Sequence, residues 1–222
     1  MKISQINLFQ NMNDTEIVGL KENGFLRHKS YDKGERIFNM GDVITETGAV
    51  LSGGVVIQNI DFLGNTSVIT QATEGQLFAE TYALSGEPMM VEAICKEHSE
   101  ILFVNIKNML MAENSVFSWY NKFCMSLMNI TARKNIELSR RIFCTSPKKV
   151  RTRVIIYLSE ESVKANSSEF EIPFNRRQMA DYLNLDRSAL SKELCKMRDE
   201  KIISFNKNHF KLLKNKSNSL LF

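Results

Sequence analysis

The sequence is poor in the residues from which metal and redox sites are built. Its four cysteines are scattered without a CxxC pair, so their spacing predicts neither a zinc ribbon nor a redox dithiol, and we expect reduced thiols that mostly fill cores. The three histidines, His28, His98 and His209, have no carboxylate or cysteine partner at ligand spacing. No metal site is therefore predicted, and no cofactor is evident.

Enzyme motifs and long hydrophobic runs are missing as well. The chain lacks the P-loop, GxGxxG, HExxH and GxSxG patterns, so no catalytic residue is predicted. The N-terminal segment has no apolar run long enough for a secretory signal, and no other stretch approaches a membrane span. We expect a cytoplasmic protein with no membrane partner, whose 222 residues, 43% of them hydrophobic, can bury two modest cores.

Basic residues are concentrated toward the C-terminus. Residues 141–222 contain 17 Lys and Arg against 9 Asp and Glu, a net charge of +8, whereas residues 1–140 have a net charge of −4. This asymmetry is typical of a nucleic-acid-binding domain joined to a domain that does not touch nucleic acid.

Residues 175–202, NRRQMADYLNLDRSALSKELCKMRDEKI, predict a helix, a tight turn and a second helix. Asn184 stands at the bend, because a left-handed residue is often needed there and Asn adopts that conformation more readily than most residues. Asp186 can cap the second helix by accepting from its first backbone N–H groups. Apolar residues recur at helical spacing and are expected to face inward: Met179, Ala180, Leu183, Leu190, Leu194 and Met197.

The opposite side of the second helix is basic and carries short hydrogen-bonding groups, as a helix in a DNA major groove requires. The residues expected on this face are Arg187, Ser188, Ser191 and Lys192. An αα-hairpin with a solvated polar face is the alternative. The segment that follows, IISFNKNHFKLL (202–213), predicts a two-stranded hairpin whose tip carries Lys207, His209 and Lys211, and this favours a winged helix-turn-helix.

Upstream, Pro147 is expected to begin a helix whose first turns are basic, with Val150, Val154, Ile155 and Leu158 inward. Cations at a helix N-terminus oppose the macrodipole, so Lys148, Lys149, Arg151 and Arg153 favour an external anion such as phosphate, although a solvated charge run remains an alternative. Phosphate contacts are expected from Arg176, Arg177, Lys149, Lys207 and His209.

The first 114 residues alternate short apolar strands with glycine-bearing turns, which is typical of an all-β barrel, sandwich or roll. A short helix ending at Asn23-Gly24 precedes them. Residues 115–144 then form a long helix with two adjacent apolar stripes, of which burial on the chain's own roll explains one. We therefore expect a dimer formed by Phe117, Tyr120, Cys124, Leu127, Met128, Thr131 and Leu138.

The order of roll, long helix and winged helix-turn-helix resembles the Crp/Fnr superfamily over nearly the whole chain. The resemblance rests on YDKGERIFNMGD (31–42), LSGGVVI (51–57), DFLGN (61–65), GQLFAETYALSGEP (75–88) and RRQMADYLNLDRSALSKEL (176–194). It implies an α+β protein: a cyclic-nucleotide-binding-like β-roll (1–114), a dimerisation helix (115–144) and a winged helix-turn-helix (145–222). The implied partners are a second copy and near-palindromic double-stranded DNA, with RNA polymerase as a further candidate.

Departures from the family pattern limit what the roll is expected to bind. Family members that bind cyclic AMP hold the ribose with Gly-Glu and the phosphate with an arginine, whereas this chain has Ala79-Glu80 and then Met89-Met90-Val91. A buried phosphate without a cation is costly, so cyclic AMP is not expected. Iron–sulfur members use clustered N-terminal cysteines, which are missing, while a haem ligated by histidine or cysteine stays open. Residues proposed to line or simply fill an effector pocket are Phe78, Ala79, Glu80, Met89 and Met90.

In the second helix, Ser188 and Lys192 replace the glutamate and arginine that the family commonly uses to read bases, so the operator should differ from its best-known half-sites. The sequence therefore predicts a homodimeric, sequence-specific transcription regulator with an unidentified small-molecule effector. Two alternatives remain. One is a ligand-binding or catalytic roll whose basic domain contacts proteins, and the other is a constitutive regulator without an effector.

Overall fold

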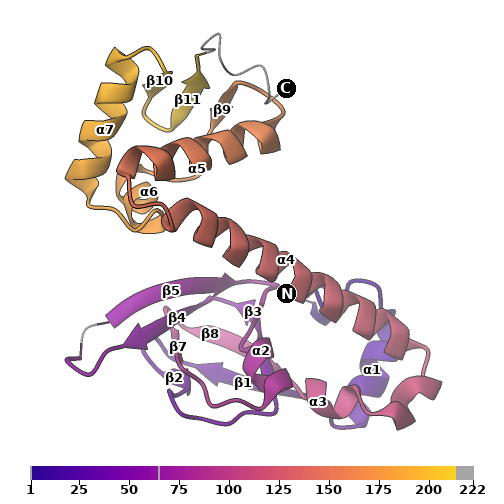
Figure 1. The fold of residues 1–222 in the computed structure, drawn as a ribbon. Coiled ribbons are helices and arrows are strands. Elements are labelled where there is room, and N and C mark those ends of the chain that lie inside the picture. Colours follow the sequence, from indigo (N-terminus) through magenta and orange to yellow (C-terminus); the bar gives the residue numbers. More distant parts are fainter. Residues whose placement is uncertain (1, 65, 214–222) are drawn as a thin grey trace. The chain divides into compact units, whose positions relative to one another are not determined.

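Residues 2–64 and 66–213 are described by the structure, a computed structural model whose contacts divide the chain into two units at the Arg133–Lys134 bond (Figure 1). The strands of the N-terminal unit are β1 (Leu26–Tyr31), β2 (Arg36–Phe38), β3 (Thr47–Ser52), β4 (Gly54–Ile60), β5 (Thr66–Thr73), β6 (Leu77–Phe78), β7 (Glu92–Cys95) and β8 (Ser99–Val104). Its helices are η1 (Ile3–Gln5), α1 (Asp14–Glu22), α2 (Glu80–Ser85), α3 (Ile106–Met109) and η2 (Ala112–Val116).

The strands form two antiparallel four-stranded sheets, ordered β1-β8-β3-β6 and β2-β7-β4-β5. Register sets Ala49 of β3 opposite Leu102 of β8, and both side chains are buried. The Phe38 ring of one sheet meets the Phe103 ring of the other edge to face, with their centroids 5.8 Å apart. One apolar core thus takes side chains from both sheets, and the predicted β-roll and α+β class are confirmed.

Two glycines are required by close packing in the roll. Gly53 turns the chain between β3 and β4 at φ 84°, where a Cβ would lie 2.4 Å from the Ser99 hydroxyl. A Cβ on Gly48 would lie 2.1 Å from the Phe78 ring. Gly53 thus divides the segment AVLSGGVVIQNI into two strands that belong to different sheets, β3 and β4.

Strand β1 was not predicted, because four of its six residues are exposed and polar. It nevertheless pairs with β8, and this pairing gives two histidines the carboxylate partners that sequence spacing did not reveal. His28 contacts Glu100, and His98 Nδ1 lies 2.9 Å from Asp32 Oδ1. The hydrogen bond that the His98 ring donates to the Asp32 carboxylate raises the pKa of His98.

Helix α4 (Trp119–Thr145) is tied at its start to α1 through Glu16. The Lys122 ammonium donates to both Glu16 carboxylate oxygens at 2.9 Å, and the Ser118 hydroxyl donates at 2.7 Å. Burial alone would raise the pKa of Glu16. The hydrogen bonds from Lys122, Ser118 and the Asn13 N–H together outweigh this effect, so the pKa lies below its usual value. The helix begins later than expected, because residues 112–116 form the separate turn η2.

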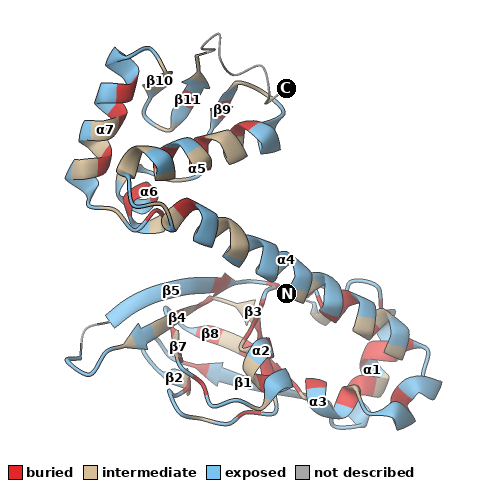
Figure 2. Cartoon of the chain, in the orientation of Figure 1, coloured by how far each residue is buried: buried red, intermediate tan, exposed pale blue. Residues whose placement is uncertain are grey.

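The two apolar stripes of α4 have different surroundings (Figure 2). Trp119, Phe123 and Leu127 are buried in the core of the roll. Leu127 was assigned to the dimer seam on sequence grounds, but its side chain is covered within its own unit. Met128 is 56% exposed and Leu138 59% exposed.

The C-terminal unit holds the last turns of α4, then α5 (Val150–Ala165), β9 (Glu169–Glu171), α6 (Arg176–Tyr182), α7 (Arg187–Asp199), β10 (Ile203–Asn206) and β11 (His209–Leu212). A three-stranded sheet, ordered β10-β11-β9, packs with the helices around a second apolar core. The predicted winged helix-turn-helix is confirmed. Strand β9 was not predicted, because it has three residues and two of them are glutamates.

The expected helix at Pro147 begins instead at Val150, after Lys149 in extended conformation. Its inner face also differs from the prediction, because Ile155 is exposed and Tyr157 is buried. No described helix has both the length and the apolar character needed to cross a membrane.

Candidate DNA-binding surface

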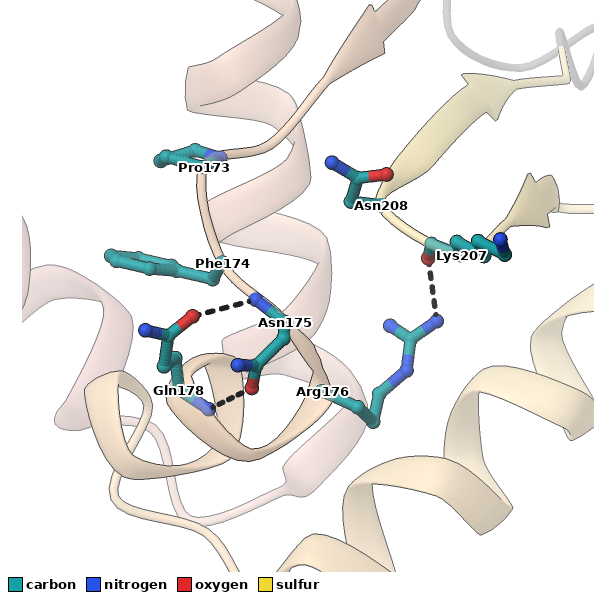
Figure 3. Close-up of a pocket in the computed structure, with 7 residues that line it drawn as sticks. All are labelled: Pro173, Phe174, Asn175, Arg176, Gln178, Lys207 and Asn208. Atoms are coloured by element: carbon teal, nitrogen blue, oxygen red, sulfur yellow. Dashed lines mark hydrogen bonds between the residues drawn. The ribbon is translucent and has the colours of Figure 1, made fainter.

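Side-chain caps fix both helices of the helix-turn-helix. Asn175 Oδ1 accepts from the backbone N–H groups of Arg177 and Gln178, each at 3.0 Å. In return, Gln178 Oε1 accepts from Asn175 N at 2.9 Å, and Figure 3 shows the two bonds between Asn175 and Gln178. This capping box was not recognised in the sequence. At the bend, Asn184 has φ 51°, and Asp186 Oδ1 accepts from Ser188 N at 2.7 Å, as predicted.

Helix α7 has one buried face and one exposed face. Leu190, Leu194 and Met197 are buried in the C-terminal core. Arg187, Ser188 and Lys192 are exposed and Ser191 is half-buried, as the helical spacing predicted. The Ser188 hydroxyl also donates to Asp186, so this residue contributes to the helix cap.

Cys195 was missed by the sequence analysis. Its thiol is exposed, unlike the buried thiols of Cys95 and Cys144. Helical spacing places Cys195 seven residues after Ser188 and three after Lys192, on the face that carries them. The expectation that cysteines fill cores therefore does not hold for this one.

Arg151 of α5 attaches α7 to the domain core. Its Nε donates to Glu193 at 2.5 Å, and its two terminal nitrogens donate to Glu200 at 2.6 and 2.9 Å. Hydrogen bonding from Arg151 lowers the pKa of Glu200. This cluster holds α7 near both its middle and its end.

Arg153 also has partners inside the domain, since its guanidinium donates to the carbonyls of Pro147 at 2.6 Å and Asn184 at 2.9 Å. An external anion is therefore not needed to explain Arg151 or Arg153. Lys148 and Lys149 of the same basic run are exposed.

Some basic side chains of the wing contact a carboxylate of the same domain, and another is exposed without such a partner. Lys211 Nζ lies 2.9 Å from Glu169 of β9, and His209 Nε2 lies 3.7 Å from the same carboxylate. Lys207 forms the turn with φ 54° and is exposed. Within the described ranges, its ammonium has no carboxylate partner.

A cleft of about 560 Å³ lies between the start of α6 and the wing turn (Figure 3). It is lined by amides, an aromatic ring and two cations: Pro173, Phe174, Asn175, Arg176, Gln178, Lys207 and Asn208. Two of its polar side chains are already bonded: Arg176 donates to the Lys207 carbonyl at 3.0 Å, and Asn208 donates to the Glu171 carboxylate at 2.6 Å.

The five residues proposed for an effector pocket have different environments. Phe78 and Met89 are buried in the apolar core, and Glu80 is buried at the start of α2. Ala79 has φ 63°, a conformation that favours the glycine of the family's Gly-Glu pair. Met90 is 72% exposed.

Comparison with known proteins agrees with this architecture. Residues 28–112 match the cyclic nucleotide-binding domain, and residues 152–216 match the Crp-like helix-turn-helix domain. No relative was found among curated proteins.

Solved structures resemble the chain over most of its length. The catabolite activator protein of Thermus thermophilus has a TM-score of 0.55 at 19% identity, over 93% of each chain. OCPA-complexed CprK has a TM-score of 0.64 at 15% identity, over 87% of this chain and 88% of CprK. A CooA mutant from Carboxydothermus hydrogenoformans has a TM-score of 0.60 at 17% identity, over 97% and 94%. At these sequence identities, the similarity to the three structures shows a shared fold and nothing about function.

The two matched domains occur in the order that the β-roll and the winged domain have in the structure, and together they cover most of the chain. The family consists of transcription regulators and not of enzymes. The chain belongs to the Crp/Fnr superfamily of DNA-binding transcription regulators.

Proposed function

We propose that this regulator works as a homodimer that binds a near-palindromic DNA operator through α7 and the wing. The observation that carries the proposal is the exposed face of α7, which presents basic and hydroxyl side chains opposite its buried residues. Family membership also supports a cytoplasmic location and RNA polymerase as a partner on the bound operator.

Each residue of the surface has a proposed role. Arg187, Ser188, Ser191 and Lys192 meet base edges in the major groove. Arg177, Lys149 and Lys207 meet phosphates, since their side chains are exposed. His209 stays a proposed phosphate contact, although Glu169 competes for it.

We propose that α4 forms the dimer seam. Its exposed apolar residues Met128, Leu138 and Ile142 recur at intervals of ten and four, which keeps them on one side of the helix. Thr131 lies between them, and Phe117, Tyr120 and Cys124 extend the seam toward the roll. Two-fold symmetry would then place the half-sites about one helical turn apart, roughly 34 Å.

The experiment that tests the function is selection of duplexes from a randomised pool, followed by titration at several salt concentrations. A regulator should enrich a two-fold symmetric sequence and bind it with a steep salt dependence. A roll protein whose basic domain contacts other proteins should enrich no sequence, and that result would contradict the proposal.

Arg177→Ala should weaken binding to all duplexes to a similar degree. Arg177 is exposed at the start of α6, so we expect it to neutralise a phosphate and not to read a base. The slope of log affinity against log salt should fall by about one unit, with the preferred sequence unchanged. Fluorescence anisotropy with cognate and scrambled duplexes measures both quantities. A changed base preference would assign Arg177 to a base contact instead.

Cyclic AMP and cyclic GMP should not bind the roll at physiological concentrations. The segment Met89-Met90-Val91 has no arginine to pair with the cyclic phosphate, so the ligand would lose its hydration without a cation in return. Calorimetry with either nucleotide should therefore detect no heat of binding. A micromolar dissociation constant would mean that a cation elsewhere in the chain supplies the missing charge. An effector, if the roll has one, is proposed to be less polar.

A further inference from the structure

We infer that Arg176 is a positioning residue that holds the wing tip against α6, so that Lys207 is presented to the DNA backbone. This inference rests on the proposed DNA-binding function and changes the role that the sequence suggested for Arg176, which was a direct phosphate contact.

The contacts of Arg176 point to the wing. Its Nη2 donates to the Lys207 carbonyl at 3.0 Å, and Figure 3 shows its side chain extended toward that turn. Its guanidinium carbon lies 5.1 Å from the centre of the Phe205 ring and 5.4 Å from that of Phe210. One side chain of α6 therefore reaches both wing strands and the turn between them.

The burial of Arg176 separates it from its neighbour. Arg176 is half-buried, and burial lowers its pKa, whereas Arg177 is exposed. A guanidinium that covers aromatic rings and donates to a carbonyl has fewer N–H groups left for a phosphate. The two adjacent arginines are thus suited to different tasks.

The wing turn needs such support because of its backbone. Lys207 has φ 54°, a left-handed conformation that is costly for a residue with a side chain. Arg176 fixes the Lys207 carbonyl on one side. On the other side, Asn208 donates to Glu171 at 2.6 Å, and its carbonyl accepts from Ile172 N at 2.9 Å. The backbone of the turn is held from both sides, while the Lys207 ammonium stays exposed.

The wing is also linked to α7. The guanidinium carbon of Arg198 lies 5.8 Å from the centre of the Phe205 ring, which Arg176 also contacts. The wing strand β10 therefore contacts arginines from both helices of the helix-turn-helix. These contacts fix the position of the wing tip relative to α7, so a phosphate contact by Lys207 and base contacts by α7 can form together.

The test is a double-mutant cycle on DNA affinity between Arg176→Ala and Lys207→Ala. If Arg176 acts through the wing tip, Arg176→Ala should weaken binding about tenfold in the wild type but less than about twofold when Lys207 is already alanine. Arg177→Ala is the matched control, because it removes the same charge one residue away, and its effect should be equal in both backgrounds. Fluorescence anisotropy at fixed salt measures the DNA affinity of six proteins: the wild type, the three single variants and the two double variants that contain Lys207→Ala.

Three further measurements guard against a merely structural effect. Thermal unfolding checks that each variant is folded. Arg176→Lys keeps a charge and a donor but lacks the planar guanidinium, so it should bind DNA as weakly as Arg176→Ala. Hydrogen exchange of the amides of β11 in the free protein should become faster in both variants.

The outcomes are distinguishable. Equal effects of Arg176→Ala in both backgrounds, or wild-type affinity in Arg176→Lys, would overturn the positioning role and restore a direct phosphate contact. A Lys207→Ala protein with unchanged affinity would also overturn it. If the wild type itself shows no salt-dependent duplex binding, the proposed function fails and the inference fails with it.

Discussion

Met128→Asp is expected to convert the dimer into monomers and to abolish tight operator binding. Met128 is 56% exposed in the single chain, on the stripe of α4 that the roll does not cover. In a two-fold seam, the substitution would bury two carboxylates without cationic partners. Such burial costs on the order of 3 kcal/mol or more, so the dimer dissociation constant should rise by at least about a hundredfold.

Operator affinity should fall with the dimer, because a monomer contacts one half-site only. Sedimentation velocity over a range of protein concentrations measures the first effect, and titration of a full operator measures the second. Asn129→Asp is the matched control, since Asn129 is exposed and the next helix position points away from the seam. It should leave the dimer intact.

Leu127→Asp cannot serve as this test, although the apolar pattern assigned Leu127 to the seam. Leu127 lies in the core of the roll, so an aspartate there should unfold the unit and not simply separate two copies. A Met128→Asp protein that remains a dimer at the same concentrations as the wild type would exclude α4 as the interface.

The case of α4 shows what apolar periodicity can and cannot predict. The pattern correctly indicated a long helix with more apolar surface than one neighbour covers. It could not say which stripe the roll covers, because both have helical spacing. That assignment depends on tertiary packing, such as the tie between Glu16 and Lys122, residues more than 100 positions apart in the chain.

The helix-turn-helix was predictable nearly residue by residue, because its signals are local. Asn184 and Asp186 act within a few positions of their own backbone, and Leu190 and Leu194 follow the helical period. These features need no knowledge of distant residues.

The roles of the arginines were not predictable in the same way. Arg151 pairs with glutamates 42 and 49 residues away, and Arg176 reaches a carbonyl 31 residues away. Sequence reasoning treated both as cations available to phosphate, because their partners come close only when the sheet and helices have packed. The same holds for His28 and Glu100, which strand pairing brings together.

Lys192→Ala is expected to change which base pairs the protein prefers and to weaken binding to the cognate operator. Lys192 is exposed on α7, on the face opposite Leu190 and Leu194, where a side chain can reach base edges in the major groove. Loss of a base contact there should cost about 1–3 kcal/mol at the cognate site and little at a scrambled one. The affinity ratio between the two duplexes should fall accordingly.

Ser188→Ala should also change which base pairs the protein prefers, with a loss of affinity at the cognate site similar to that of Lys192→Ala. Its hydroxyl donates to Asp186 in the free protein, but Asp186 also accepts from two backbone N–H groups, so the helix cap should survive the loss. The free energy of unfolding, measured by thermal denaturation, should therefore fall by less than about 1 kcal/mol. A larger loss would indicate that Ser188 acts mainly in the cap.

Selection from a randomised operator pool, run in parallel on the wild type, Lys192→Ala, Ser188→Ala and Arg177→Ala, separates base contacts from phosphate contacts. The first two variants should enrich altered half-sites, whereas Arg177→Ala should enrich the wild-type sequence with lower affinity. Lysine is a single point donor without the planar fork of arginine, so the wild-type preference at the Lys192 position should itself be moderate. A Lys192→Ala protein that keeps the wild-type sequence with uniformly lower affinity would show that Lys192 contacts a phosphate and that another residue of α7 reads that base.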